Sequence, residues 1–102
     1  MKDKLLQIIN HYGINNQQRK LQEEIFELQE AINIHELKES VEYEIPLTEI
    51  YGTKKHLTEE IGDVIVLIKQ IQLYYEIPTE EVKKIIEYKV NRQIERIDSE
   101  TI

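Results

Sequence analysis

The chain has 102 residues, which suits one domain spanning 1–102. Small helical domains often complete their core by pairing with a second copy, so we expect a homodimer or homotetramer. Its 20 acidic residues outnumber its 13 basic ones, for a formal net charge of -7, which argues against binding to a nucleic-acid polymer and favours capture of cations or cation-loaded ligands. Cysteine is absent, no apolar run approaches the roughly 18 residues of a membrane span, and 1–9 lacks a signal-peptide pattern, so we expect a cytoplasmic protein with no membrane partner and no thiolate metal site.

Glycine marks the joint between the first two predicted helices. The first helix should end near Tyr12, with Gly13 as its C-terminal cap. Asn15 or Asn16 can cap the second helix, which should run to about Glu39. The apolar face of the second helix has a 4-3-4 spacing, at Leu21, Ile25, Leu28 and Ile32.

The segment 40–53 breaks the helical pattern. Apolar residues alternate with others there, but Pro46 lies inside the run, so we predict an extended, ordered loop insertion instead of a strand. A third helix should then run from about Lys54 or Thr58 to Tyr75. Its apolar face comprises Leu57, Ile61, Val64, Ile65, Ile68 and Ile71.

A fourth helix follows the turn at Pro78. Thr79 should cap it, and Glu80 and Glu81 lie in its first turn, where the helix dipole favours acid. The end of the chain after Asp98 should fray. The pattern as a whole predicts an all-α, four-helix-bundle-like domain.

Two acidic pairs occupy matching positions on the two long central helices. Advancing about 100° per residue puts Glu24 roughly 70° and Glu27 roughly 130° from the apolar face of the second helix. On the third helix, Glu60 and Asp63 have about the same two offsets, in the same rotational sense. If the apolar faces pack together, both pairs flank one groove.

Four carboxylates around one groove need a counter-charge, because like charges repel more strongly where the dielectric is low. Magnesium suits them, since it prefers carboxylate oxygens and keeps waters or substrate phosphates as further ligands. The residues are compatible with one ion or two, and Mn²⁺ is an alternative; the lack of soft ligands argues against zinc. Alone, the motif Glu23-Glu24-Ile25-Phe26-Glu27 usually marks a solvated helix face, and the second pair is what favours a site.

These motifs resemble the signature of the MazG-like all-α nucleoside triphosphate pyrophosphohydrolase superfamily. The first reads Glu23-Glu24-x-x-Glu27 and the second Glu60-x-x-Asp63. Leu28 and Val64 flank them as is typical of the family, and the resemblance covers roughly 10–96.

The resemblance implies a fold, a reaction and a set of roles. It implies a MazG-type domain that hydrolyses nucleoside triphosphates between the α- and β-phosphates, releasing a nucleoside monophosphate and pyrophosphate. Its magnesium ligands are then Glu24, Glu27, Glu60 and Asp63. The general base is Glu27 or Glu23, and the sequence leaves that choice open.

Polar residues around these motifs are candidates for substrate binding. Gln17 and Lys20 project on the acidic side of the second helix, so Gln17 can contact phosphate, sugar or base and Lys20 can contact phosphate. For Lys20, a salt bridge to Glu24 is an equal alternative. Lys89 and Arg92 resemble the family's late basic motif, and an Arg can hold a phosphate through two hydrogen bonds. Pairing with nearby glutamates is the alternative for these two.

The spacing between Glu27 and Glu60 is longer than is usual in the family, and the excess lies in 40–53. This segment can cover the site, bind the base or contact a neighbouring subunit. Two other functions stay open. One is phosphoribosyl-ATP pyrophosphohydrolase, whose second phosphorylated ribose calls for more cationic residues than this chain offers. The other is a non-catalytic helical regulatory or interaction module.

Overall fold

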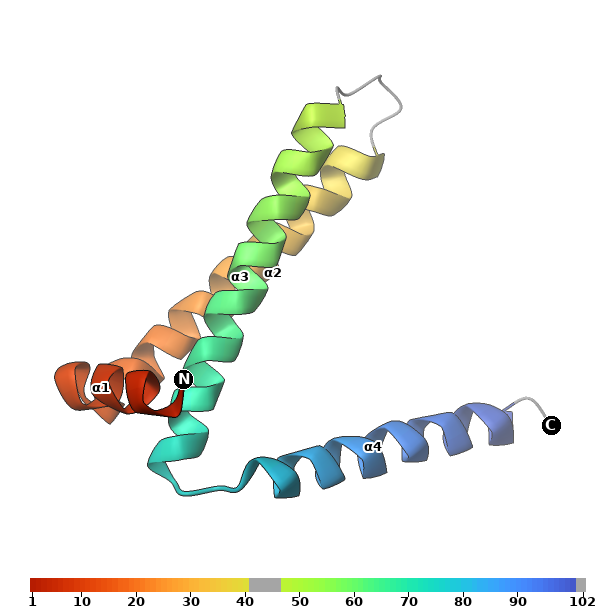
Figure 1. Ribbon diagram of the computed structural model, residues 1–102. Helices are drawn as coiled ribbons and strands as arrows, with labels where there is room; N and C mark the ends of the chain where they lie inside the picture. The colour runs from red at the N-terminus through yellow and green to blue at the C-terminus, as the bar shows by residue number, and fades with distance from the viewer. Residues whose placement is uncertain (41–46, 101–102) are drawn as a thin grey trace.

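The computed structural model describes residues 1–40 and 47–100, with side chains described in 1–38 and 52–100. Every element in these ranges is an α-helix, so the all-α prediction is confirmed (Figure 1). The helices are α1 (Lys2–Tyr12), α2 (Ile14–Ser40), α3 (Leu47–Tyr74) and α4 (Thr79–Glu100). None of the described helices combines the length and the apolarity that crossing a membrane requires.

Helices α2 and α3 form a long antiparallel hairpin, with α1 lying across one end of it (Figure 1). Leu5 and Ile9 of α1 are buried where that helix meets the hairpin. Between α2 and α3, the buried apolar side chains are Ala31, Val64 and Leu67. Among the described residues this core is small, so their packing relies on few buried apolar side chains.

Gly13 is the C-terminal cap of α1, as predicted. Its φ of 87° lies in the left-handed region that glycine adopts without a steric penalty, and its N–H donates to Ile9 O over 2.7 Å. The prediction of an Asn15 or Asn16 cap is wrong, because Gly13 also starts the next helix by accepting a hydrogen bond from the N–H of Gln17. The Asn16 side chain instead donates to Tyr12 O, at 2.6 Å.

Helix α3 begins at Leu47, earlier than predicted, so 47–53 is helical and not part of an extended loop. Ser40 belongs to α2, and the rest of the predicted loop, 41–46, lies outside the described residues. The alternation that suggested an extended chain is short, whereas Leu47, Ile50 and Tyr51 have the i, i+3, i+4 spacing of a helix face. A hydrogen bond of 2.8 Å between Thr53 Oγ1 and His35 Nδ1 joins this turn of α3 to α2.

The contact between α2 and α3 is rotated from the predicted one. The buried residues of α2 are seven apart, at Gln17, Glu24 and Ala31, and on α3 the same spacing joins Glu60 to Leu67. Four of the six predicted core isoleucines flank this seam and stay about half exposed (Ile25, Ile61, Ile65 and Ile68), whereas Ile32 and Ile71 are partly buried. The two glutamates therefore lie within the helix contact and not beside it.

Helix α4 extends away from the hairpin, and in the described part of the chain it does not pack along any other helix (Figure 1). It starts one residue earlier than a Thr79 cap would require, because Pro78 O already accepts from the N–H of Val82. The side chain of Thr79 instead accepts a hydrogen bond from Gln72 of α3. The helix continues to Glu100, so 99–100 are helical, and the rest of the end predicted to fray, 101–102, lies outside the described residues.

Candidate metal centre

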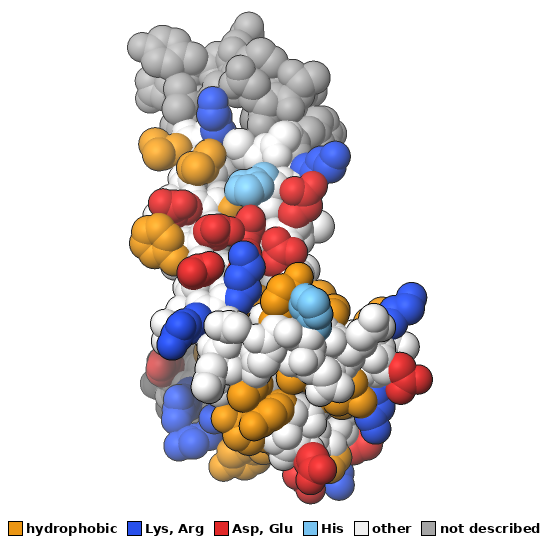
Figure 2. Space-filling view, turned by 90° about the vertical axis from the view of Figure 1, so that its left-hand side faces the viewer, with side chains coloured by type: hydrophobic (Ala, Val, Ile, Leu, Met, Phe, Trp, Pro, Cys, Tyr) orange, Lys and Arg blue, Asp and Glu red, His pale blue; other side chains and the backbone are white. Residues whose placement is uncertain are grey.

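Three carboxylates from two helices meet near the middle of the hairpin. Glu24 of α2 and Glu60 and Asp63 of α3 each offer an oxygen, and these oxygens lie within 4.8 Å of one another. We call these three residues the carboxylate centre. Glu24 and Glu60 lie in the helix seam, each 6% exposed, while Asp63 is one turn further along α3 and exposed. Figure 2 shows acidic side chains gathered over this part of the hairpin.

Two oxygens of the carboxylate centre lack a hydrogen-bond partner. Glu24 Oε2 and Glu60 Oε2 are buried, and no described atom donates to them. Leaving a buried polar atom unpaired costs about 1–3 kcal/mol, and more for a charged group. A hard divalent cation would satisfy both oxygens, and a donor set made only of carboxylate oxygens is one that Mg²⁺ or Mn²⁺ accepts. The residues present therefore fit such an ion.

The pKa values of the two buried glutamates shift in opposite directions. Burial, and then the neighbouring Glu24 carboxylate, raise the pKa of Glu60. Burial also acts to raise the pKa of Glu24, but its interactions with Glu60 and Lys20 outweigh burial and lower it. Without a cation, the pair thus holds a proton more readily on Glu60 than on Glu24.

Lys20 supplies a positive charge to the centre from one turn earlier on α2. Its Nζ lies 3.4 Å from Glu24 Oε1 and 4.0 Å from Glu23 Oε2. Hydrogen bonding to Glu24 raises the pKa of Lys20, so the ammonium form is favoured. The salt bridge considered for Lys20 is therefore present, and it leaves Glu24 Oε2 free for another partner.

The two candidates for a general base are both exposed. Glu27 lies one turn after Glu24 but is not part of the carboxylate centre. Its pKa is raised, mainly by the charge of Glu24. Glu23 lies on the other side of Glu24 in sequence and faces Lys20. The metal and base roles of Glu27, and the base role of Glu23, stay predictions.

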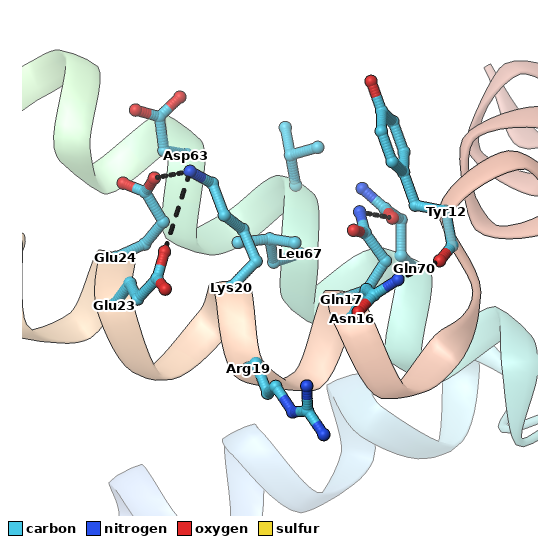
Figure 3. A pocket seen from close by; sticks show the side chains of 11 residues that line it. Tyr12, Asn16, Gln17, Arg19, Lys20, Glu23, Glu24, Asp63, Leu67 and Gln70 are labelled. Carbon is cyan, nitrogen blue, oxygen red and sulfur yellow. Dashed lines mark hydrogen bonds and ion pairs between the residues drawn. The ribbon is translucent and has the colours of Figure 1, made fainter.

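A cavity of about 640 Å³ opens beside the carboxylate centre. Predicted site residues form one part of its wall (Gln17, Lys20, Glu23, Glu24 and Asp63). Tyr12 and Gln70 add further wall that the sequence interpretation did not assign (Figure 3). The volume falls in the range of about 300–1,000 Å³ typical of small-ligand sites.

Gln70 is the residue that the sequence interpretation missed. It is 2% exposed and bonded to Gln17 across the seam, with Gln17 Nε2 donating to Gln70 Oε1 over 2.7 Å. A signal for it was available, since Gln70 follows Asp63 by seven residues and therefore shares its side of α3. Gln70 was missed because the apolar face predicted for α3 was centred on its isoleucines, and a buried polar residue was not expected on the neighbouring side.

Lys89 and Arg92 are not brought to the carboxylate centre within one chain. Both are exposed on α4, which does not pack along another helix in the described part of the chain. A phosphate-binding role for them therefore depends on where α4 lies in an assembly.

No family model matches this chain, and no curated protein or solved structure matches it either. What the chain does is therefore inferred from the chemistry of the carboxylate centre and the adjoining cavity. An ion held by Glu24, Glu60 and Asp63 would lie at the edge of a space large enough for a phosphorylated small molecule.

Proposed function

We propose that this chain is a magnesium-dependent nucleoside triphosphate pyrophosphohydrolase, which releases a nucleoside monophosphate and pyrophosphate. The observation that carries the proposal is the pair of buried, unpaired oxygens, Glu24 Oε2 and Glu60 Oε2, in a carboxylate centre whose Glu24 and Asp63 line the cavity. Carboxylates placed this way favour binding of a metal–polyphosphate complex. The resemblance of the two acidic motifs to the MazG-like superfamily supports the same reaction.

The protein's own residues then have defined tasks. Glu24, Glu60 and Asp63 hold the ion, with Glu27 as a further ligand or as the base. When bound, the ion supplies neutralisation of phosphate charge and a lowered pKa for a coordinated water. Glu27 or Glu23 accepts the proton of the attacking water. Lys20 can exchange its contact with Glu24 for one with a substrate phosphate, because it lines the cavity.

The proposal includes a MazG-type assembly in which α4 of one copy packs against the hairpin of another. The single chain has a radius of gyration of 18.0 Å, against about 13 Å for a compact domain of 100 residues. Apart from the partly buried Val82, the aliphatic residues of α4 are about half exposed (Ile85, Ile86, Val90, Ile94 and Ile97). The hairpin offers half-exposed isoleucines in return, at Ile61, Ile65 and Ile68. Such packing would bury both apolar surfaces. It would also place Lys89 and Arg92 beside the hairpin of the other copy.

The deciding experiment measures pyrophosphate release from a panel of standard and modified ribo- and deoxyribonucleoside triphosphates, with and without Mg²⁺. We expect release that requires the metal and yields the monophosphate. Release of single phosphates, or release that persists in EDTA, contradicts the proposal. If no nucleoside triphosphate reacts while the metal binds, phosphoribosyl-ATP is the next substrate to test. Failure there as well favours a regulatory module.

A further inference from the structure

The Gln17–Gln70 pair lines the same cavity as Glu24 and Asp63, two helical turns away from them. Gln17 comes from α2 and Gln70 from α3, and both side chains are more than nine-tenths buried. Their amides are joined by the bond from Gln17 Nε2 to Gln70 Oε1. Figure 3 shows this bond between Tyr12 on one side and Lys20 on the other.

Each amide keeps one polar atom that this bond does not use. Gln17 Oε1 remains an acceptor and Gln70 Nε2 remains a donor, and no described protein atom bonds to either. Gln17 and Gln70 both line the cavity, so these atoms are available to a ligand bound there. If both amides were rotated by half a turn, the pair would still present one donor and one acceptor, so this property does not depend on how the amide atoms are assigned.

We propose that the Gln17–Gln70 pair recognises the hydrogen-bonding edge of the substrate's base. This inference rests on the proposed function, in which phosphates bind at the carboxylate centre. The pairing edge of every nucleobase carries a donor beside an acceptor, which complements the two free amide atoms. Tyr12, Val66 and Leu67 add aromatic and aliphatic wall for the base itself.

A second explanation must be separated from this one, because a buried amide pair can also serve only to join α2 to α3. The two explanations differ for the double variant Gln17→Met with Gln70→Met. Replacing both partners of a buried hydrogen bond by apolar groups of similar shape is nearly neutral for stability. The double variant should therefore fold, and it tests recognition without leaving an unpaired amide behind.

The test compares kcat/KM for nucleoside triphosphates with kcat/KM for inorganic triphosphate, which has the phosphates but no base. We expect wild-type protein to prefer the nucleotides, and the double variant to lose about ten- to a hundredfold of that preference. Gln29→Met, an exposed change on the same helix that lies away from the cavity, should keep the preference. An equal loss on both substrates would overturn the proposal, as would a wild-type protein with no preference for a base.

A binding measurement tests the pair even if no nucleotide is hydrolysed. Nucleoside monophosphates are titrated into ¹⁵N-labelled wild-type protein without metal, and the side-chain amide signals of Gln17 and Gln70 are followed. We expect these signals to move with the nucleotides and to stay in place with inorganic phosphate. If no nucleotide shifts these amide signals, base recognition is overturned. If nucleotides shift the signals but are not hydrolysed, only the proposed reaction is overturned.

Discussion

Glu24 and Glu60 occupy positions in the helix seam where an apolar side chain would normally lie. Each is 6% exposed and keeps an oxygen without a partner. Burial raises the pKa of Glu60, so its charged form lowers the stability of the metal-free protein instead of raising it. Residues that cost stability in this way are often placed for binding, and a cation is the simplest group that offsets the cost here.

Metal binding should therefore be measurable as stability. Mg²⁺ at ten times its dissociation constant should add about 1.4 kcal/mol to the free energy of unfolding, which corresponds to a rise of several degrees in Tm for a domain of this size. Glu60→Gln and Asp63→Asn should each abolish this rise and the turnover while keeping the helical circular dichroism signal. Glu30→Gln, an exposed change on α2, is the matched control. A full metal-induced rise in Glu60→Gln would remove that residue from the centre.

The pH dependence of the metal-free protein follows from the opposite shifts of the two buried glutamates. The pKa of Glu60 is raised above its ordinary value of 4.5, so the folded chain takes up this proton at a higher pH than the unfolded chain. In EDTA, stability should thus rise as the pH falls through the raised pKa of Glu60 towards 4.5. The lowered pKa of Glu24 reverses the trend below that value, because stability is then lost as its carboxylate is protonated. Chemical denaturation across this range measures both trends, and Glu60→Gln should flatten the first.

At the scale of the helices, the sequence predicted the helices themselves more accurately than the helix faces that contact each other. Gly13 and the turn at Pro78 mark joints because glycine and proline act locally. The seam could not be chosen locally, since α3 carries apolar residues over more than one face and Ile61 and Ile65 compete with Val64 and Leu67. With isoleucines of α3 placed in the α2–α3 contact, the glutamates were expected to lie beside it. In the structure Glu24 and Glu60 lie in the contact, and Ile61 and Ile65 lie beside it.

A pair of substitutions on α3 tests the rotated seam. Leu67→Ala removes a buried side chain and should cost about 2–4 kcal/mol of unfolding free energy at any protein concentration. Ile65→Ala changes a residue that is 46% exposed within one chain, so its effect should appear mainly as weaker association and should vary with protein concentration. Urea unfolding at two widely separated concentrations distinguishes them. Equal, concentration-independent costs would mean that Ile65 is core, as the sequence pattern first suggested.

For the molecule as a whole, a single chain buries few of its many hydrophobic side chains. The chain is 40% hydrophobic, but among the described residues only Leu5, Ile9, Ala31, Val64 and Leu67 are buried apolar side chains. Sequence alone predicted that a second copy is needed, from length, but it could not say which surface receives it. The free helix α4 and the exposed isoleucines of α3 now supply both halves of a candidate contact.

The same surfaces predict that the cationic residues of α4 act in the site of another copy. Lys89→Ala with Arg92→Ala should raise KM or lower kcat, because these side chains reach phosphate only through the assembly, and Glu60→Gln should be inactive. Co-expression of the two defective chains should nevertheless restore activity. In a randomly mixed dimer population, half the dimers are mixed and each holds one intact site, so about a quarter of the wild-type rate should return.

Separate tags on the two chains allow the mixed dimers to be purified and their rate measured directly. Mixed dimers that form but stay inactive would place Lys89 and Arg92 outside the partner's site, and purified chains that remain monomeric would remove the assembly itself.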